Sequence, residues 1–265
     1  MANLKEIRNR ITSIKSTMQI TSAMKMVSAA KLKKAQDAIT AMRPYSSKLS
    51  ELLQNLSASL DSDASSEYSK PREVSKVLIV AITSNRGLCG GFNSSITKGV
   101  MRTIQEKYSD VKVDIFSIGK KGGDVLAKKV SVVEKRNDIY DDLTFDNVAA
   151  IAEELMLLYT NRTYDKIELV YNQFKNAATQ ITQVEQFLPI KPIDGEREIS
   201  DADYIFEPSK EEIVLALIPK SLKTQLYKAI RDSFASEHGA RMTAMHKATD
   251  NAKDLRDGLL LTYNK

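Results

Sequence analysis

Apolar residues near the start of the chain recur at alternating intervals of three and four, the spacing of a helix that packs against another helix. One series consists of Leu4, Ile7, Ile11, Ile14, Met18 and Thr21, and a second of Ala35, Ala38, Met42, Tyr45, Leu49, Leu52 and Leu56. They predict one helix from Leu4 to about Leu60, in which the single proline, Pro44, causes a bend and not a stop. Between the two series, Thr21, Met24 and Val27 advance by threes, which predicts a locally overwound seam.

The last part of the chain contains a similar series, which supplies a partner for the first helix. It consists of Met245, Ala248, Ala252, Leu255, Leu259 and Thr262. This second long helix is expected to begin at Ser209, which forms a capping box with Glu212, and to break or kink near Ile218 because Pro219 follows. Because the chain has to return for the two helices to meet, the simplest topology is an antiparallel coiled coil with the intervening residues inserted between them.

Between the two helices, short β-branched runs alternate with helical segments. The expected strands are Val74–Thr83, Val111–Ile118, Val130–Lys135, Lys166–Asn172 and Thr179–Leu188, and the expected helices are Ser94–Tyr108, Val125–Lys128 and Asp146–Tyr159, the last capped by Thr144 or Asn147. This order predicts an α/β layer domain with a mostly parallel sheet. The predicted divisions are residues 1–60, 72–190 and 209–265, joined by a Ser-rich linker, Asp61 to Lys70, and a loop, Pro189 to Pro208.

Composition narrows the possible functions. A chain of 265 residues that is 42% apolar can form a packed core. The only cysteine, Cys89, excludes an internal disulfide, and with only His238 and His246 beside it the chain offers no zinc site. The N-terminus lacks the apolar core of a secretory signal, and no stretch is as apolar as a membrane span. A soluble or membrane-peripheral protein is expected.

The positive charge is concentrated in the first helix. Residues 1–50 contain ten Lys and Arg against Glu6 and Asp37, a net charge of +8, whereas the whole chain carries +5, so the remainder is near −3. A basic rod attracts nucleic acid, anionic lipid or an acidic protein surface. A simpler interpretation is that these lysines only solvate the face of a long helix.

A glycine-rich turn, Ser84 to Asn93, is the best local candidate for chemistry, because such a turn between a strand and a helix can bind phosphate. Gly87, Gly90 and Gly91 do not fit the spacing of a dinucleotide site, however, and no nucleotide P-loop is present. The turn is therefore interpreted either as a tight turn that needs positive φ or as a protein contact through Arg86.

The titratable residues do not form an active site. The adjacent carboxylates, Asp141-Asp142, Glu153-Glu154 and Glu211-Glu212, are expected to point to different faces of their helices. His238 and His246 are expected to be exposed. Met24 and Met26 cannot both face one seam, so at least one of them is expected to face solvent.

Three segments closely resemble the gamma subunit of the rotary ATP synthase and lie in that family's order and spacing. They are Leu4 to Gln36, Thr83 to Asn93 and Ser236 to Ala252. The resemblance implies an α/β plus coiled-coil fold, with an antiparallel coiled coil of long N- and C-terminal helices and an inserted Rossmann-like α/β domain. It also implies a non-catalytic rotor shaft without cofactors, which couples proton or sodium flow to ATP synthesis or hydrolysis at alpha/beta catalytic sites.

The resemblance further implies partners and contact residues. The coiled coil is expected to stand inside the ring of alpha and beta subunits, and the α/β domain and the lower coiled coil are expected to bind epsilon and the c-subunit ring. The chain is expected at the cytoplasmic face of the cell membrane, with no nucleic acid partner. The expected subunit contacts are Arg8, Arg10, Met24, Lys25, Lys31, Lys33, Lys34, Arg86, Gly87, Leu88 and Gly90. The lysines and Arg86 are expected to meet an acidic loop on beta, and Met24 aligns with the shaft methionine of the family.

Two departures from the family pattern are visible. Asn85 stands where the family usually has Asp. Family chains continue for several helical turns beyond the match to Tyr263–Lys265, so we expect that the chain is shortened, that its tip lies outside these 265 residues, or that torque is delivered lower down. With only Cys89, the chain cannot have the cysteine-pair switch of the plant chloroplast form. The main alternative is a basic coiled coil that binds DNA or an anionic membrane; a Rossmann-type nucleotide enzyme is disfavoured by the glycine spacing.

Overall fold

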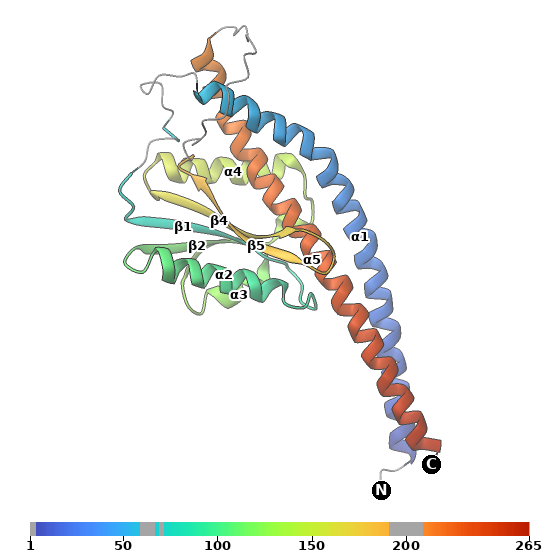
Figure 1. Cartoon of the computed structure of the whole chain (residues 1–265). Helices are drawn as coiled ribbons and strands as arrows, with labels where there is room; N and C mark the ends of the chain where they lie inside the picture. The colour runs from blue at the N-terminus through green and yellow to red at the C-terminus, as the bar shows by residue number, and fades with distance from the viewer. Residues whose placement is uncertain (1–3, 59–66, 69–71, 191–208, 265) are drawn as a thin grey trace.

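In a computed structural model, two long helices lie side by side as a rod, and an α/β domain packs against one part of it (Figure 1). The structure describes residues 4–58, 67–68, 72–190 and 209–264. The predicted linker, Asp61 to Lys70, and the predicted loop, Pro189 to Pro208, therefore lie almost entirely outside the described residues.

The rod consists of α1 (Leu4–Ala58) and α5 (Lys210–Asn264), each 55 residues long and therefore about 80 Å in length. The two termini lie at the same end of the rod in Figure 1, so the helices are antiparallel, as predicted. Both helices continue through their prolines, Pro44 and Pro219. The helix does not break near Ile218, because Ile218 and Leu222 pack into the core of the α/β domain and stabilise α5 where proline removes a backbone hydrogen bond; the alternative of a kink stays a prediction.

The seam of α1 keeps the register of the first predicted series and departs from the second series where Ile39, and not Ala38, is buried. Its buried residues are Ile7, Ile11, Thr21, Ser28, Leu32, Ala35, Ile39 and Leu49, which fit an unbroken alternation of three and four. The predicted overwound stretch is wrong: Val27 is 58% exposed, and Ser28, 2% exposed, takes the seam position. Ser28 can be buried because its hydroxyl donates to the carbonyl of Met24 at 2.7 Å, which leaves no unpaired polar group.

Three apolar residues of the predicted seams also face solvent. Leu4 and Tyr45 on α1 are exposed, and so is Leu255 on α5. Arg256 occupies the half-buried position beside Leu255, with its Nη1 atom 4.0 Å from the sulfur of Met18 on α1. The long aliphatic stem of arginine serves there as seam packing, which an assignment by apolarity alone misses.

The α/β domain has a five-stranded sheet with the strand order β3-β2-β1-β4-β5. The strands are β1 (Lys76–Ile82), β2 (Lys112–Ile118), β3 (Ser131–Arg136), β4 (Lys166–Phe174) and β5 (Gln180–Leu188), and the remaining helices are α2 (Phe92–Lys107), α3 (Lys120–Leu126), the short 3-10 helix η2 (Asp138–Tyr140) and α4 (Phe145–Thr160). The first four strands in this order are parallel and only β5 is antiparallel, so the predicted mostly parallel sheet is confirmed.

Local details refine the predicted boundaries. The helix expected at Val125–Lys128 begins earlier, at Lys120, and ends at Leu126. Thr144, and not Asn147, caps α4, because its hydroxyl accepts the amide hydrogen of Asn147 at 3.4 Å. At the start of α5, the hydroxyl of Ser209 accepts the amide hydrogen of Glu212 at 3.2 Å, the first half of the predicted capping box.

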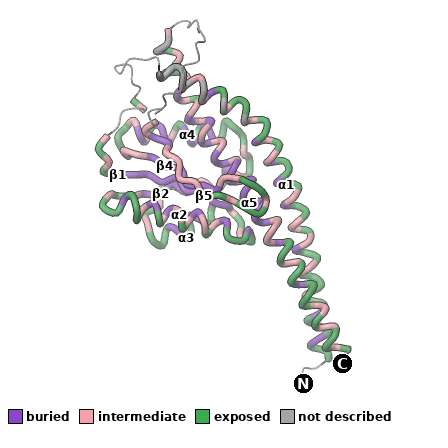
Figure 2. Tube along the Cα trace, in the orientation of Figure 1, coloured by how far each residue is buried: buried purple, intermediate pink, exposed green. Residues whose placement is uncertain are grey.

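The core lies on both faces of the sheet, and β1 is its centre. Leu78, Val80 and Ile82 face the side covered by α4 and α5, whereas alternate residues of the same strand face α2 and α3 (Figure 1). Figure 2 shows that buried residues gather in the sheet and in the part of α5 that lies against it, while the rod near both termini is mostly exposed. The exposed end of the rod therefore offers a large surface to partners.

Candidate functional site

Helix α5 passes over the carboxyl ends of β1 and β4, and it is bonded there to the strands themselves. The hydroxyl of Ser233 donates to the carbonyl of Ile82 at 3.3 Å, and that of Ser236 to the carbonyl of Asn172 at 2.9 Å. In sheets of this order, ligands bind beyond the carboxyl ends at the point where the strand order reverses, here between β1 and β4. Helix α5 of the chain itself occupies this place. Its position agrees with the glycine spacing of the turn, which does not fit a dinucleotide site.

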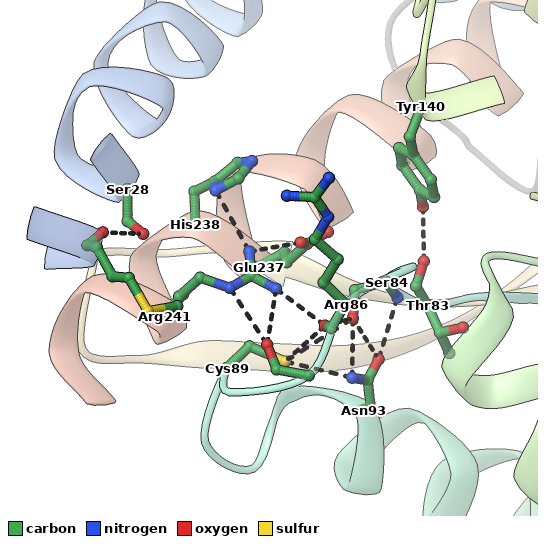
Figure 3. Close-up of polar contacts among 12 residues, drawn as sticks. Ser28, Thr83, Ser84, Arg86, Cys89, Asn93, Tyr140, Glu237, His238 and Arg241 are labelled. Atoms are coloured by element: carbon green, nitrogen blue, oxygen red, sulfur yellow. Dashed lines mark hydrogen bonds and ion pairs between the residues drawn. The ribbon is translucent and has the colours of Figure 1, made fainter. Parts of the chain in front are cut away.

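The turn after β1 is tied together at its base. The carboxamide of Asn93 accepts the amide hydrogen of Ser84 at 3.0 Å and donates to the sulfur of Cys89 at 3.2 Å (Figure 3). Cys89 is buried, and burial raises the pKa of its thiol, so this thiol is a neutral packing group. The predicted positive φ is found at Gly90 (φ 58°) and also at Leu88 (φ 61°).

The middle of this turn faces outward. The side chains of Arg86 and Leu88 are exposed, Leu88 by 65%. An exposed leucine in the left-handed backbone region is unusual, because side chains are strained there. The turn therefore displays a cation and an apolar side chain next to each other on a fixed backbone.

A buried cation on α5 binds the backbone of the turn. The guanidinium of Arg241 donates through Nη2 to the carbonyls of Arg86 (2.9 Å) and Gly87 (3.2 Å), and through Nη1 to the Glu237 carboxylate (2.6 Å) (Figure 3). Both side chains of this ion pair are only 9% exposed. Hydrogen bonds from a charged donor are stronger than neutral ones, so the turn is firmly attached to α5.

The environment of this ion pair shifts two pKa values. Burial raises the pKa of Glu237, while Arg241 acts in the opposite direction. Burial, assisted by the positive charges of Arg241 and Lys31, lowers the pKa of His238 to about 3, so its imidazole is neutral at physiological pH. The expectation that His238 is exposed is wrong: it is 5% exposed, and its ring contacts that of Phe234, one turn earlier on α5, at a centroid distance of 4.5 Å. His246 is exposed, as predicted.

An aromatic contact links this cluster to the loop that follows β3. The ring of Tyr140 stacks on Phe234 at 6.0 Å, and its hydroxyl donates to the carbonyl of Thr83 at 2.8 Å (Figure 3). Asn85 joins the same loop, since its carboxamide donates to the carbonyl of Asn137 at 2.6 Å and accepts the amide hydrogen of Lys120 at 3.0 Å. The asparagine that departs from the family pattern thus has a structural role as both donor and acceptor.

The predicted contact residues on α1 do not form one cluster. Arg10, Lys31, Lys33 and Lys34 are exposed, and Lys33 pairs with Asp37 of its own helix at 2.9 Å. Two others face the partner helix instead: Nη2 of Arg8 donates to the hydroxyl of Tyr263 at 2.7 Å, and Nζ of Lys25 lies 3.4 Å from Nδ1 of His246. Met24 is half-buried, and Met26, 64% exposed, is the methionine that faces outward.

The structure brings only part of the predicted set together. The positive charges of Lys31 and Arg86 both lower the pKa of Glu237, so these two cations lie near the buried pair from different elements. Sequence reasoning missed Glu237 and Arg241, although both lie in a segment that resembles the family. An i,i+4 acid–base pair among small residues was the available signal, but on a solvated helix such pairs are common and weak.

The adjacent carboxylates behave as surface groups. Glu153 pairs with Lys223, and Glu154 pairs with Arg136 at 2.7 Å, so the two neighbours point apart as predicted. The side chain of Glu211 lies outside the described residues. Within the described ranges, no three His, Cys, Asp or Glu residues are placed to hold a metal ion. In the same ranges, no helix is long and apolar enough to cross a membrane.

In comparisons with known proteins, almost the whole chain is similar to members of a single protein family. A family model described as ATP synthase matches residues 3–265. The chain is 70% identical to the ATP synthase gamma chain of Flavobacterium psychrophilum and 69% identical to that of Flavobacterium johnsoniae, and each alignment covers 100% of this chain and 92% of the relative.

Solved structures agree with these sequence comparisons. The structure resembles a chain of the central stalk and c-ring of Tetrahymena thermophila mitochondrial ATP synthase, with a TM-score of 0.65 at 27% identity over 86% of this chain and 99% of that chain. It also has the fold of a rotor chain of Euglena gracilis mitochondrial ATP synthase, with a TM-score of 0.69 at 21% identity over 98% of this chain and 96% of that chain.

Proposed function

This chain belongs to the family of ATP synthase gamma chains, and from that premise we propose that it is the central-stalk rotor subunit of an ATP synthase. It couples ion flow across a membrane to ATP synthesis or hydrolysis and is itself non-catalytic. The observation that carries this proposal is the 70% identity over the full chain, joined to a rod about 80 Å long. Its partners are the alpha and beta subunits, the epsilon subunit and the c-subunit ring.

A rotor needs faces that differ. A shaft that contacted identical partners equally on all sides would not favour one conformation of any of them. The two helices of this rod differ in charge: residues 1–50 carry a net charge of +8, whereas residues 246–264 contain three Lys and Arg against three Asp. The antiparallel packing places a strongly basic helix beside a nearly neutral one, and the rod is therefore electrostatically one-sided.

Residues of α1 and of the turn supply the contacts to the catalytic head. Those proposed to touch alpha or beta subunits are Arg8, Arg10, Met24, Lys25, Lys31, Lys33, Lys34, Arg86, Gly87, Leu88 and Gly90. An acidic loop on beta is the expected counterpart of Lys31 and Arg86, which both act electrostatically on the Glu237 carboxylate from different elements. Each exposed pair contributes at most ~1 kcal/mol, so binding depends on the set as a whole.

The remaining parts of the chain face the membrane side of the complex. The subunit belongs to a membrane-associated complex, and we place it at the cytoplasmic face of the cell membrane as a peripheral component. The α/β domain, residues 72–190, is the unit proposed to bind epsilon and the c-subunit ring. The helices of residues 1–60 and 209–265 form the shaft.

The test uses the complete ATP synthase with substitutions in the shaft. A triple variant, Lys31→Ala, Lys33→Ala and Lys34→Ala, is expected to lower ATP-driven ion pumping and rotation of a probe on the α/β domain, because an acidic partner loses three cations. The matched control replaces the same lysines by arginine, which keeps the charge. Pumping and rotation unchanged in the alanine variant would remove this basic face from the mechanism.

The same preparation tests the alternative of a nucleic-acid-binding coiled coil. That alternative predicts association with duplex DNA that weakens steeply as salt is raised. It also predicts no stable complex with alpha and beta subunits. Co-purification with alpha and beta, together with rotation of the probe, decides in favour of the rotor.

A further inference from the structure

We propose that Arg241 is a positioning residue that fixes the contact turn, Arg86–Gly90, to the shaft and makes it move as one body with α5. The proposal rests on the role of Arg86 as a subunit contact. It assigns a function to a buried side chain of α5. The proposal is based on the hydrogen bonds that the guanidinium of Arg241 makes.

One side chain satisfies acceptors from two distant parts of the chain. Arg241 donates to the Arg86 and Gly87 carbonyls at 2.9 and 3.2 Å and to the Glu237 carboxylate at 2.6 Å. The turn and α5 are separated by about 150 residues in the sequence, so this bridge is purely tertiary. A guanidinium presents several donors in a rigid planar fork, whereas a lysine at this position has a single nitrogen for the same task.

The middle of the turn has few other attachments among the described residues. Asn93 and Cys89 tie its base together, and the hydroxyl of Ser84 donates to the Arg86 carbonyl at 2.7 Å. For the Gly87 carbonyl, Arg241 is the donor that the structure shows. The exposed side chains of Arg86 and Leu88 therefore take their position from a backbone that Arg241 holds.

The side chain of Arg241 is itself surrounded by charged and polar groups from three elements. Glu237, four residues earlier on α5, is buried with Arg241, and Lys31 of α1 and Arg86 of the turn act electrostatically on the same carboxylate. The neutral imidazole of His238 lies with its Nδ1 atom 3.5 Å from Nη1 of Arg241. The buried, hydrogen-bonded pair of Glu237 and Arg241 is rigid, so a rotation of α5 carries the turn with it.

The variants are chosen so that the fold survives. Arg241→Met alone leaves Glu237 as a buried, unpaired carboxylate, which by itself is strongly destabilising. The main variant is therefore the double replacement Arg241→Met and Glu237→Met, which removes both charges and keeps the apolar volume. Arg231→Met is the matched control, because Arg231 on the same helix donates to the carbonyl of Leu143 and does not touch the turn.

The first readout is hydrogen exchange of the amides of residues 86–90 in the assembled complex. The double variant is expected to raise their exchange rate by about tenfold, the factor for about 1.4 kcal/mol of opening free energy, whereas Arg231→Met leaves it unchanged. Unchanged exchange in the double variant would overturn the proposal. This readout does not depend on what the turn contacts.

The second readout is ATP-driven ion pumping, measured with and without Arg86→Ala. If Arg241 acts through the turn, the double variant lowers pumping severalfold in the parent but adds no further loss to Arg86→Ala. Losses that simply add would contradict the proposal. If Arg86→Ala itself leaves pumping intact, the contact role of the turn fails, and hydrogen exchange alone then decides whether Arg241 anchors it.

Discussion

Two glycines on α5 test how closely this helix lies against the end of the sheet. At Gly239, a Cβ atom would lie 3.1 Å from the Cα atom of Ala177, 3.3 Å from its carbonyl oxygen and 3.4 Å from the ring of Phe174. At Gly258, nothing lies within 4 Å of such an atom. Alanine therefore meets backbone atoms at the first position and open space at the second.

The two substitutions are expected to change stability in opposite directions. Replacing glycine by alanine within a helix is worth about 0.8–1.0 kcal/mol, and this gain applies at both positions. At Gly239 the added methyl group forces a shift in the loop between β4 and β5, and overpacking of this kind costs about 1–3 kcal/mol. Gly258→Ala should thus stabilise by about 1 kcal/mol, and Gly239→Ala should destabilise by about 1 kcal/mol.

Urea denaturation of the two variants and the parent provides the measurement. A change in the midpoint with an unchanged slope reports a change in stability, and about 1 kcal/mol moves the melting temperature of a chain of this size by about 2–4 °C. A rise in the midpoint for both variants would refute the reasoning, because α5 would then not lie against Ala177. The placement of Arg241, two residues further along α5, would fall with it.

Two further predictions concern the seam and the buried histidine. Leu32→Ala should lower the stability by about 2–4 kcal/mol, because Leu32 is buried in the seam. Leu255→Ala on the partner helix should change the stability by less than about 0.5 kcal/mol, because Leu255 is exposed. Equal losses of stability in thermal unfolding would contradict the register described above. The pKa of His238 is lowered from 6.5 to about 3 in the folded protein. Below pH 6.5 the unfolded chain therefore takes up a proton that the folded chain does not. The stability should fall between pH 6.5 and 3, by at most ~1.4 kcal/mol per pH unit. His238→Gln should lose this part of the pH dependence in urea titrations at pH 7 and 5, whereas an identical dependence in both proteins would show that His238 is accessible to protons.

The repeating pattern of apolar residues was sufficient for the architecture. A spacing of three and four revealed both long helices, and β-branched runs revealed five strands, because these periods follow from backbone geometry and are read from neighbouring residues alone. The same signal failed at single positions. Val27 is more apolar than Ser28, yet Ser28 is buried, since its hydroxyl is satisfied within its own helix and the seam geometry selects its position.

The candidate site also separates what the sequence pattern predicts from what only the tertiary structure decides. The sequence by itself determined the rod, the mostly parallel sheet, the basic first helix, the glycine-rich turn and, through three motifs, the family. Only the tertiary structure decided that His238 is buried and that Arg241 binds the turn, whose carbonyls lie about 150 residues away from Arg241 along the chain. Whether a polar side chain is solvated or buried depends on what the rest of the chain brings to it, and a local pattern carries no record of that.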